Sequence, residues 1–301
     1  MKQKIMLCAS FCMALLGMNL SSCTQEENTG NTAKLRIFPT LENPTRAVMN
    51  NFVNGNQIGL FVMAADGGNY NDCDCGFNAM ASLNASVWTV NQNIELTSAK
   101  ADIYAYYPYK AGLNSTTIPV EVASQTDYLF ATKTTADVNN PTATIPMKHA
   151  LALNSFVLKK GSYSGIGKVT KIELKNTKTE GTLDVKTGEV IVGNTKASMS
   201  AECNVVLSDN VQKISAIMMP VTITESDNIT ARFTIDGEVY SYEISPTTWA
   251  PGNENIYTLG IKEDTKKLFE IGSVEINPWG VGAQYDGNLT NDKFDVDVDI
   301  E

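Results

Sequence analysis

The sequence predicts an all-β protein built of sandwiches or barrels. Apolar and polar residues alternate with period two in many short segments, and clusters of Gly, Asn, Asp and Pro separate these segments at short intervals. A strand with one buried face needs this period, whereas an amphipathic helix needs a period near 3.6 residues, for which the chain shows little sign. Many short strands joined by polar turns are typical of β-sandwiches and β-barrels.

The alternation places fourteen strands along the chain. They cover residues 34–38, 57–63, 88–96, 101–107, 117–122, 151–159, 168–174, 189–192, 200–207, 214–218, 229–235, 238–244, 256–261 and 273–276. Asp236-Gly237 separates two of them and is a strong signal for a two-residue hairpin turn. The three tryptophans, Trp88, Trp249 and Trp279, are interpreted as core anchors rather than as a platform for a sugar.

The beginning of the sequence predicts export and a lipid anchor. Lys2 and Lys4 precede an apolar run too short to span a membrane, so residues 1–22 are predicted to be a secretory signal. The signal ends at Leu20-Ser21-Ser22-Cys23, which resembles the bacterial lipobox, whose cysteine receives lipid. Cys23 is therefore the predicted lipidation site, followed by a polar tail. The alternative is an ordinary cleavage site with an incidental cysteine.

The charge of the chain argues against nucleic-acid binding. Net charge is −10, and it becomes −12 once the signal with its two lysines is removed. Nucleic-acid binding depends on Lys and Arg side chains that neutralise phosphates, so a chain this acidic is a poor candidate for it. Electrostatic repulsion between such acidic chains favours their solubility outside the cell.

The cysteines do not form a disulfide framework. Cys73, Cys75 and Cys203 remain after loss of the signal and of Cys23, so at most one pair forms within the chain. A zinc site built from these three and His149 is a weak alternative, because Cys73 and Cys75 lack the usual two-residue spacer. A loop disulfide to Cys203, or free thiols, is favoured.

No catalytic residue, metal site or cofactor is predicted. His149 is the only histidine in the sequence, so the chain offers a single candidate base for Ser-His or Cys-His catalysis. The sequence also contains no phosphate-binding glycine loop. Asp295, Asp297 and Asp299 are spaced like calcium ligands, but no glycine follows to make the turn of a calcium loop.

Several segments resemble landmarks of the fimbrillin family, the lipoprotein-derived pilins of the type V class. They are Phe-Val-Asn-Gly-Asn-Gln-Ile-Gly-Leu-Phe-Val at 52–62, Tyr-Ala-Tyr-Tyr-Pro-Tyr at 104–109, Met-Lys-His-Ala-Leu-Ala-Leu at 147–153, Trp-Ala-Pro-Gly at 249–252 with Tyr-Thr-Leu at 257–259, and Ile-Asn-Pro-Trp at 276–279. They occur in the family's order and span most of residues 47–287. The histidine-bearing segment is similar to the strand that opens the family's second domain.

The resemblance implies a fold and an assembly route. It implies two tandem transthyretin-like β-sandwich domains, here residues 47–145 and 146–285. It also implies an outer-membrane lipoprotein precursor that a trypsin-like protease cuts after an arginine. The first strand then leaves, and a strand from a neighbouring pilin subunit fills its groove in a cell-surface fimbrium that supports adhesion.

Arg46 is the predicted processing site. Of the two arginines before residue 60, Arg36 lies within an alternating run, whereas Arg46 follows Pro44 in a polar segment expected to be exposed. Cleavage between Arg46 and Ala47 would remove residues 23–46, which comprise the lipidated tail and the first strand. The alternative is that Arg46 is simply an exposed linker arginine.

Residues 286–301 are predicted to be a tether and a donor strand. Phe294, Val296, Val298 and Ile300 alternate with acidic residues, and a segment rich in Gly, Asn and Asp precedes them. The apolar row would enter the groove of another subunit, while the acidic row would discourage aggregation of the free segment.

The predicted function is therefore a structural pilin precursor without catalytic activity. A tip or anchor subunit, which keeps its lipid and first strand, is the alternative within the family. A monomeric surface lipoprotein that binds a glycan or a host ligand is the alternative from another class.

Overall fold

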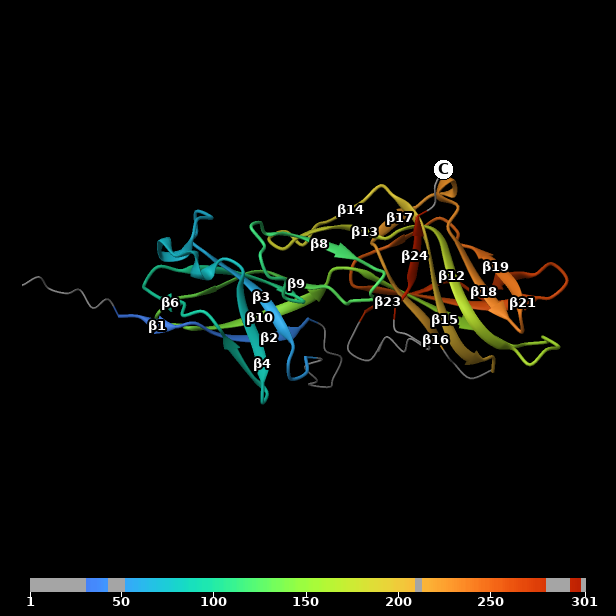
Figure 1. Ribbon diagram of the computed structural model, residues 1–301, viewed down its shortest axis with the longest axis horizontal. Coiled ribbons are helices and arrows are strands. Elements are labelled where there is room, and N and C mark those ends of the chain that lie inside the picture. The colour runs from blue at the N-terminus through green and yellow to red at the C-terminus, as the bar shows by residue number, and fades with distance from the viewer. Residues whose placement is uncertain (1–30, 43–51, 209–212, 280–292, 299–301) are drawn as a thin grey trace, which may run out of the picture. The chain divides into compact units, whose positions relative to one another are not determined.

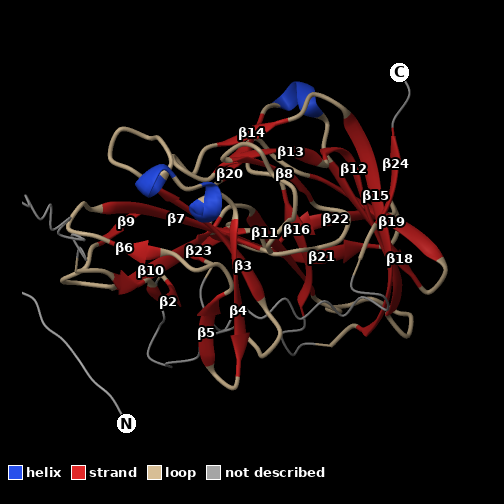
Figure 2. Cartoon of the chain, turned by 60° about the vertical axis from the view of Figure 1, so that its left-hand side comes forward, coloured by secondary structure: helices blue, strands red, loops and turns tan. Residues whose placement is uncertain are grey.

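The structure is a computed structural model that describes residues 31–42, 52–208, 213–279 and 293–298. Its regular structure consists almost entirely of strands, which confirms the all-β prediction (Figure 2). Three short 3-10 helices, η1 (Tyr70–Asp72), η2 (Asp74–Gly76) and η3 (Glu225–Asp227), lie in connections. None of the helices in the described ranges is long and apolar enough to cross a membrane.

The strands follow one another along the chain as shown in Figure 1. They are β1 (Ala33–Lys34), β2 (Arg36–Leu41), β3 (Gln57–Met63), β4 (Ala79–Asn84), β5 (Val87–Val90), β6 (Glu95–Leu96), β7 (Ala101–Tyr107), β8 (Thr117–Glu121), β9 (Leu129–Ala136), β10 (Thr142–His149), β11 (Ala152–Leu158), β12 (Lys168–Lys178), β13 (Glu180–Asp184), β14 (Val190–Val192), β15 (Lys196–Val206), β16 (Lys213–Met218), β17 (Val221–Ile223), β18 (Thr230–Ile235), β19 (Glu238–Glu243), β20 (Thr247–Trp249), β21 (Asn253–Lys262), β22 (Lys267–Glu270), β23 (Glu275–Pro278) and β24 (Asp295–Val298).

Seven strands from the first half of the chain form one sheet. Its order is β2-β10-β9-β7-β3-β4-β5, and a separate short pair joins β1 to β6. The β2–β10 pair is parallel, while the other neighbours run antiparallel. The inward residues of these strands form a buried apolar cluster that includes Ile58, Leu60, Ile103 and Ile145.

The second half of the chain forms a larger sheet. Its order is β16-β11-β21-β22-β19-β18-β12-β15-β24, and β23 also pairs with β21. The predicted hairpin at Asp236-Gly237 is confirmed, since β18 and β19 pair from Ile235 and Glu238 outward. Both turn residues have positive φ, 50° and 84°, which is the backbone geometry that a type I′ turn requires.

The two halves share structure that the predicted domain limits do not anticipate. A third sheet, β14-β13-β8, joins one strand from the first half to two from the second. Strands β17 and β20 of the second half form a separate two-stranded sheet. Phe61 and Tyr106 of the first sheet belong to the same buried cluster as Phe156 and Phe233 of the second. The described residues from 31 onward form one compact unit.

The histidine-bearing strand is placed differently from the expectation. β10 ends at His149 and belongs to the first sheet, whereas the second sheet begins with β11 at Ala152. The predicted limit between residues 145 and 146 lies inside β10, because the ladder with β2 continues through Met147. The sheets therefore change at Ala150 and Leu151, a few residues after the predicted limit.

Two of the tryptophans are core residues, as predicted. Trp249 and Trp279 are buried, and the indole N–H of Trp249 donates to the hydroxyl of Tyr257 at 2.8 Å. Trp88 is half-buried and packs edge-on against Phe52, with ring centroids 5.3 Å apart.

Candidate interface formed by the first and last strands

The first strand is an end strand of its sheet. β2 pairs in parallel with β10, from Arg36 opposite Thr142 to Leu41 opposite Met147, and the sheet order places it at the end of the described ladder. The N–H of Arg36 donates to the carbonyl of Pro141 at 2.9 Å, and the N–H of Glu42 donates to that of Met147 at 2.8 Å. By alternation, the even-numbered backbone groups face β10 and the odd-numbered groups face away from it.

Pro39 fits this arrangement. It is an odd-numbered residue in the middle of β2, so its missing N–H lies on the side away from β10 and removes no ladder bond. Proline on the outer edge also blocks the addition of another strand there. The first strand therefore has one side suited to pairing and one side suited to ending the sheet.

The inward row of the first strand belongs to the core. Leu35, Ile37 and Leu41 are 2%, 6% and 7% exposed and lie in the buried cluster of the first sheet, whereas Phe38, on the opposite face, is 55% exposed. Outside the backbone ladder, Glu42 forms an ion pair with Lys148, with 2.9 Å between carboxylate oxygen and ammonium nitrogen. The predicted strand at residues 34–38 is present as two strands, β1 and β2, with Leu35 between them, and β2 extends to Leu41.

The predicted processing residues lie beyond this strand. Arg46 and Ala47 fall in residues 43–51 and Cys23 falls in residues 1–30, so all three lie outside the described residues.

The last strand is paired within its own chain. β24 runs antiparallel to β15, with Asp295 opposite Ser200 and Val298 opposite Ala197, and Figures 1 and 2 both show the two strands side by side. The N–H of Phe294 donates to the carbonyl of Ala123 at 2.8 Å, and its ring is 3% exposed.

The pattern of exposure along the last strand follows the predicted alternation as far as it is described. Asp295 and Asp297 are exposed, whereas Phe294 is buried and Val296 is half-buried. Ile300 lies outside the described residues. The aspartates belong to a strand rather than to a loop of the calcium-binding kind.

The cysteine pairing differs from the favoured expectation. A disulfide joins Cys73 to Cys75, two residues apart, and Cys203 is a free, buried thiol. The predicted bond to Cys203 is wrong because that side chain faces the core of the second half, in strand β15. Burial, with a smaller contribution from Glu202, raises the pKa of the Cys203 thiol to about 12, so the group stays protonated and unreactive.

His149 has a structural environment. Its ring stacks on Trp279, and its Nδ1 lies 2.8 Å from a carboxylate oxygen of Asp127. With Cys73 and Cys75 bonded to each other, the zinc alternative loses its ligands. In the parts of the chain that the structure describes, no group of three or more His, Cys, Asp or Glu side chains is arranged to hold a metal ion.

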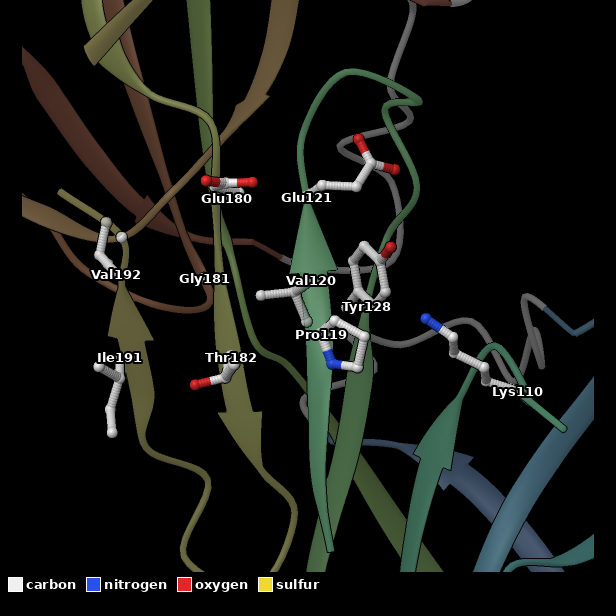
Figure 3. A pocket seen from close by; sticks show the side chains of 11 residues that line it. Lys110, Pro119, Val120, Glu121, Tyr128, Glu180, Gly181, Thr182, Ile191 and Val192 are labelled. Carbon is white, nitrogen blue, oxygen red and sulfur yellow. The ribbon is translucent and has the colours of Figure 1, made fainter. Parts of the chain in front are cut away.

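An open cavity of about 530 Å³ lies on the three-stranded sheet (Figure 3). Pro119, Thr182 and Ile191 form one cross-strand row of this sheet, and Lys110 and Tyr128 flank it. Glu121 lies opposite Glu180 in the register but turns to accept hydrogen bonds from Ser124. Burial, followed by the charge of Glu121, raises the pKa of Tyr128, so its phenol remains a neutral hydrogen-bonding group.

Solved structures with this fold come from species of Bacteroides. A candidate cell adhesion protein from Bacteroides ovatus superposes with a TM-score of 0.70 at 18% identity, over 83% of this chain and 98% of that chain. A second, from Bacteroides uniformis, has a TM-score of 0.65 at 20% identity, over 83% of this chain and 99% of that chain. A fimbrial protein from Bacteroides vulgatus has a TM-score of 0.54 at 14% identity, over 82% and 99%.

At these identities the likeness establishes the fold alone. A search of curated proteins found no match. The sequence itself matches the family model described as fimbrillin-like over residues 45–279, which is most of the chain and includes all five segments singled out above. The chain therefore belongs to the fimbrillin-like family.

Proposed function

We propose that the chain is the precursor of a structural fimbrial subunit. In this proposal Cys23 carries the lipid that holds the precursor at the outer membrane, a trypsin-like protease cuts between Arg46 and Ala47, and the subunits polymerise by strand exchange. The observation that carries the proposal is the position of β2, which together with Leu35 just before it supplies three buried apolar side chains to the core yet lies at the end of its sheet.

The loss of the first strand would leave a strong binding groove. Burial of Leu35, Ile37 and Leu41 contributes up to about 5–9 kcal/mol, taken at about 1.5–3 kcal/mol for each side chain. Cleavage at Arg46 would expose that apolar surface together with the unpaired edge of β10. An open edge with an apolar groove favours the addition of a strand from another chain.

The last strand is the proposed donor. β24 also lies at the end of its sheet, and within the described ladder its pairing with β15 covers four residue pairs. To enter another subunit it must leave this position, which exposes the ring of Phe294. In strand exchange, the last strand would leave the end of its own sheet and take the end position of another subunit's first sheet. The apolar groove left by Leu35, Ile37 and Leu41 would favour that intermolecular position.

Family membership and the end positions of β2 and β24 in their sheets support a structural role rather than catalysis. The cavity on β8, β13 and β14 favours ligand binding as a second candidate function, as expected of an adhesive tip subunit or a surface lipoprotein. Its aromatic rim at Tyr128 and mixed polar floor suit a glycan. Loss of glycan binding in Tyr128→Ala, with normal fimbriae, would support that second function.

The N-terminal residue of the protein recovered from fimbriae tests the proposal. We expect Ala47 in assembled material and lipidated Cys23 in the precursor. Arg46→Ala should leave an uncut, lipidated and unpolymerised chain. The matched control is Arg36→Ala, which changes the other arginine of this region and should leave processing intact, because Arg36 lies within the paired strand β2. Fimbriae built of uncut Arg46→Ala subunits would refute the proposal.

A further inference from the structure

Residues 34–42 and 293–301 share one pattern over nine positions. The first segment reads Lys-Leu-Arg-Ile-Phe-Pro-Thr-Leu-Glu and the second reads Lys-Phe-Asp-Val-Asp-Val-Asp-Ile-Glu. The second, fourth, sixth and eighth positions are apolar in both, as any strand with a buried face requires. The lysine that begins each segment and the glutamate that ends it are further matches that the alternation does not require.

Both charged ends of the first segment face an opposite charge. At one end, the carboxylate of Glu42 lies 2.9 Å from the ammonium of Lys148. At the other end, Lys34 stands directly opposite Glu95 in the β1–β6 register. The groove that holds the first strand therefore has an acidic residue where the strand begins and a basic residue where it ends.

We propose that residues 293–301 of a second copy replace residues 34–42 position for position and in the same direction, with Glu301 bound by Lys148. This inference rests on the strand exchange proposed above and adds its direction, its register and an anchoring residue. Phe294 would take the place of Leu35, and Ile300 that of Leu41. A reversed strand would bring Lys293 to Lys148 and Glu301 to Glu95, so like charges would meet at both ends.

This register keeps the backbone hydrogen bonds that β10 makes to the first strand. The carbonyls of Pro141 and Met147, which accept from Arg36 and Glu42, would accept from the N–H groups of Asp295 and Glu301. Val298 would occupy the place of Pro39, whose nitrogen faces away from β10, so the exchange removes no bond to β10.

The outward face of β10 also suits the donor. Its exposed residues Thr142, Thr144 and Pro146 are uncharged, so the acidic row of the donor would meet no acidic neighbour there. The charge relevant to the donor is the ammonium of Lys148, which forms an ion pair with Glu42 in the precursor. Cleavage at Arg46 would remove Glu42 and leave this ammonium available to the donor.

Disulfide cross-linking between full-length subunits tests direction and register. Cysteines at directly opposite positions of adjacent strands are within bonding distance. In cells that process and assemble the protein, Lys148→Cys combined with Glu301→Cys should give a covalent ladder after oxidation. Thr144→Cys combined with Asp297→Cys should do the same, since Phe38, the counterpart of Asp297, pairs with Thr144.

Two further pairs are the matched controls. Lys148→Cys with Lys293→Cys reports a reversed strand, and Thr144→Cys with Asp295→Cys reports a shift of two residues. A ladder from either control, but not from the expected pairs, would overturn the inference while leaving strand exchange intact. Polymers that form but give no covalent ladder with any of the four cysteine pairs would overturn strand exchange itself.

A charge exchange tests the role of Lys148. Lys148→Glu and Glu301→Lys should each lower polymer yield up to about five-fold, in line with the strength of an exposed ion pair. The double variant should recover most of that loss, whereas the control Lys100→Glu should match the parent. Equal loss in the double variant would show that the two side chains do not pair.

Discussion

The imidazole ring of His149 lies parallel to the indole ring of Trp279, with ring centroids 4.2 Å apart and planes inclined by 10°. His149 ends the last strand of the first sheet, and Trp279 follows β23, which pairs with β21 of the second. The backbone N–H of Trp279 also donates to the carbonyl of Gly252 at 2.7 Å. The stack therefore links the strand that holds β2 to the segment of chain that precedes the last strand.

Trp279→Ala should lower the free energy of unfolding by about 3–5 kcal/mol, because the indole is 5% exposed and its loss leaves a cavity. His149→Phe keeps a ring on the indole but loses the contact with Asp127, so it should cost about 1 kcal/mol. Urea unfolding of the uncleaved precursor measures both. A Trp279→Ala variant as stable as the parent would mean that the stack does not join the two halves.

The two faces of the first strand should respond differently to truncation. Ile37→Ala should lower precursor stability by about 2–4 kcal/mol, whereas Phe38→Ala should change it by less than about 0.5 kcal/mol because the ring is mostly exposed. If the proposed cleavage at Arg46 removes this segment, neither substitution should affect the stability of the assembled protein. Melting of matched precursor and fimbrial samples would decide this, and an effect of Ile37→Ala that persists in fimbriae would contradict removal of the strand.

The proposed donor strand should be sensitive to charge on its apolar face. The double variant Val296→Asp with Val298→Asp should form no polymers, because two carboxylates cannot enter an apolar groove without partners. The melting temperature of its monomer should fall much less than the polymer yield, since Val296 is only half-buried against the core of its own chain. Asp295→Asn with Asp297→Asn is the control on the exposed face. An equally large loss in polymer and monomer would identify β24 as an ordinary sheet strand.

Phe294 should behave differently from these valines. Its ring is buried in the core of the precursor, so Phe294→Ala should lower monomer stability by about 3–5 kcal/mol as well as weaken polymers. This burial departs from the expectation that the last strand adds little to its own core. Monomer unfolding in urea, compared with the valine variants, measures the difference, and an unchanged midpoint would contradict the buried position.

Cys203 should react only when the protein unfolds. Its thiol pKa is raised by burial from 9.0 to about 12, so the folded chain keeps the proton between these values while the unfolded chain releases it. The contribution of this group to stability is therefore complete below pH 9 and declines as pH rises toward 12. Alkylation of native protein at pH 8 should leave Cys203 unmodified until urea is added, and rapid labelling of the folded chain would contradict its burial.

Lipidation is tested by Cys23→Ala. The precursor should then lose its partition into the detergent phase, because the remaining chain has no other predicted anchor. Cys203→Ala serves as the matched control, since it removes a cysteine from the core and should leave partition unchanged. Parent-like partition of Cys23→Ala would disprove lipidation at this residue.

The amino-acid sequence alone identified much of the local structure. β3 and β7 have the predicted limits, and the hairpin at Asp236-Gly237 forms where expected. These features depend on side-chain alternation over a few residues and on the φ angles that glycine and aspartate tolerate, so neighbouring residues suffice to specify them. The sequence did not predict β9, because Thr-Lys-Thr-Thr at residues 132–135 carries no apolar alternation.

Tertiary structure alone decided which segments meet. The sequence predicted that residues 34–38 and 294–300 are strands with an apolar face, but it did not identify β10 and β15 as their partners. It favoured a bond to Cys203 or free thiols, whereas Cys73 pairs with Cys75. It did not predict the stack of His149 on Trp279 or the sheet that joins β8 to β13. The period of a strand states only that one face is buried; the partner depends on contacts between residues far apart in the chain, which no local pattern encodes.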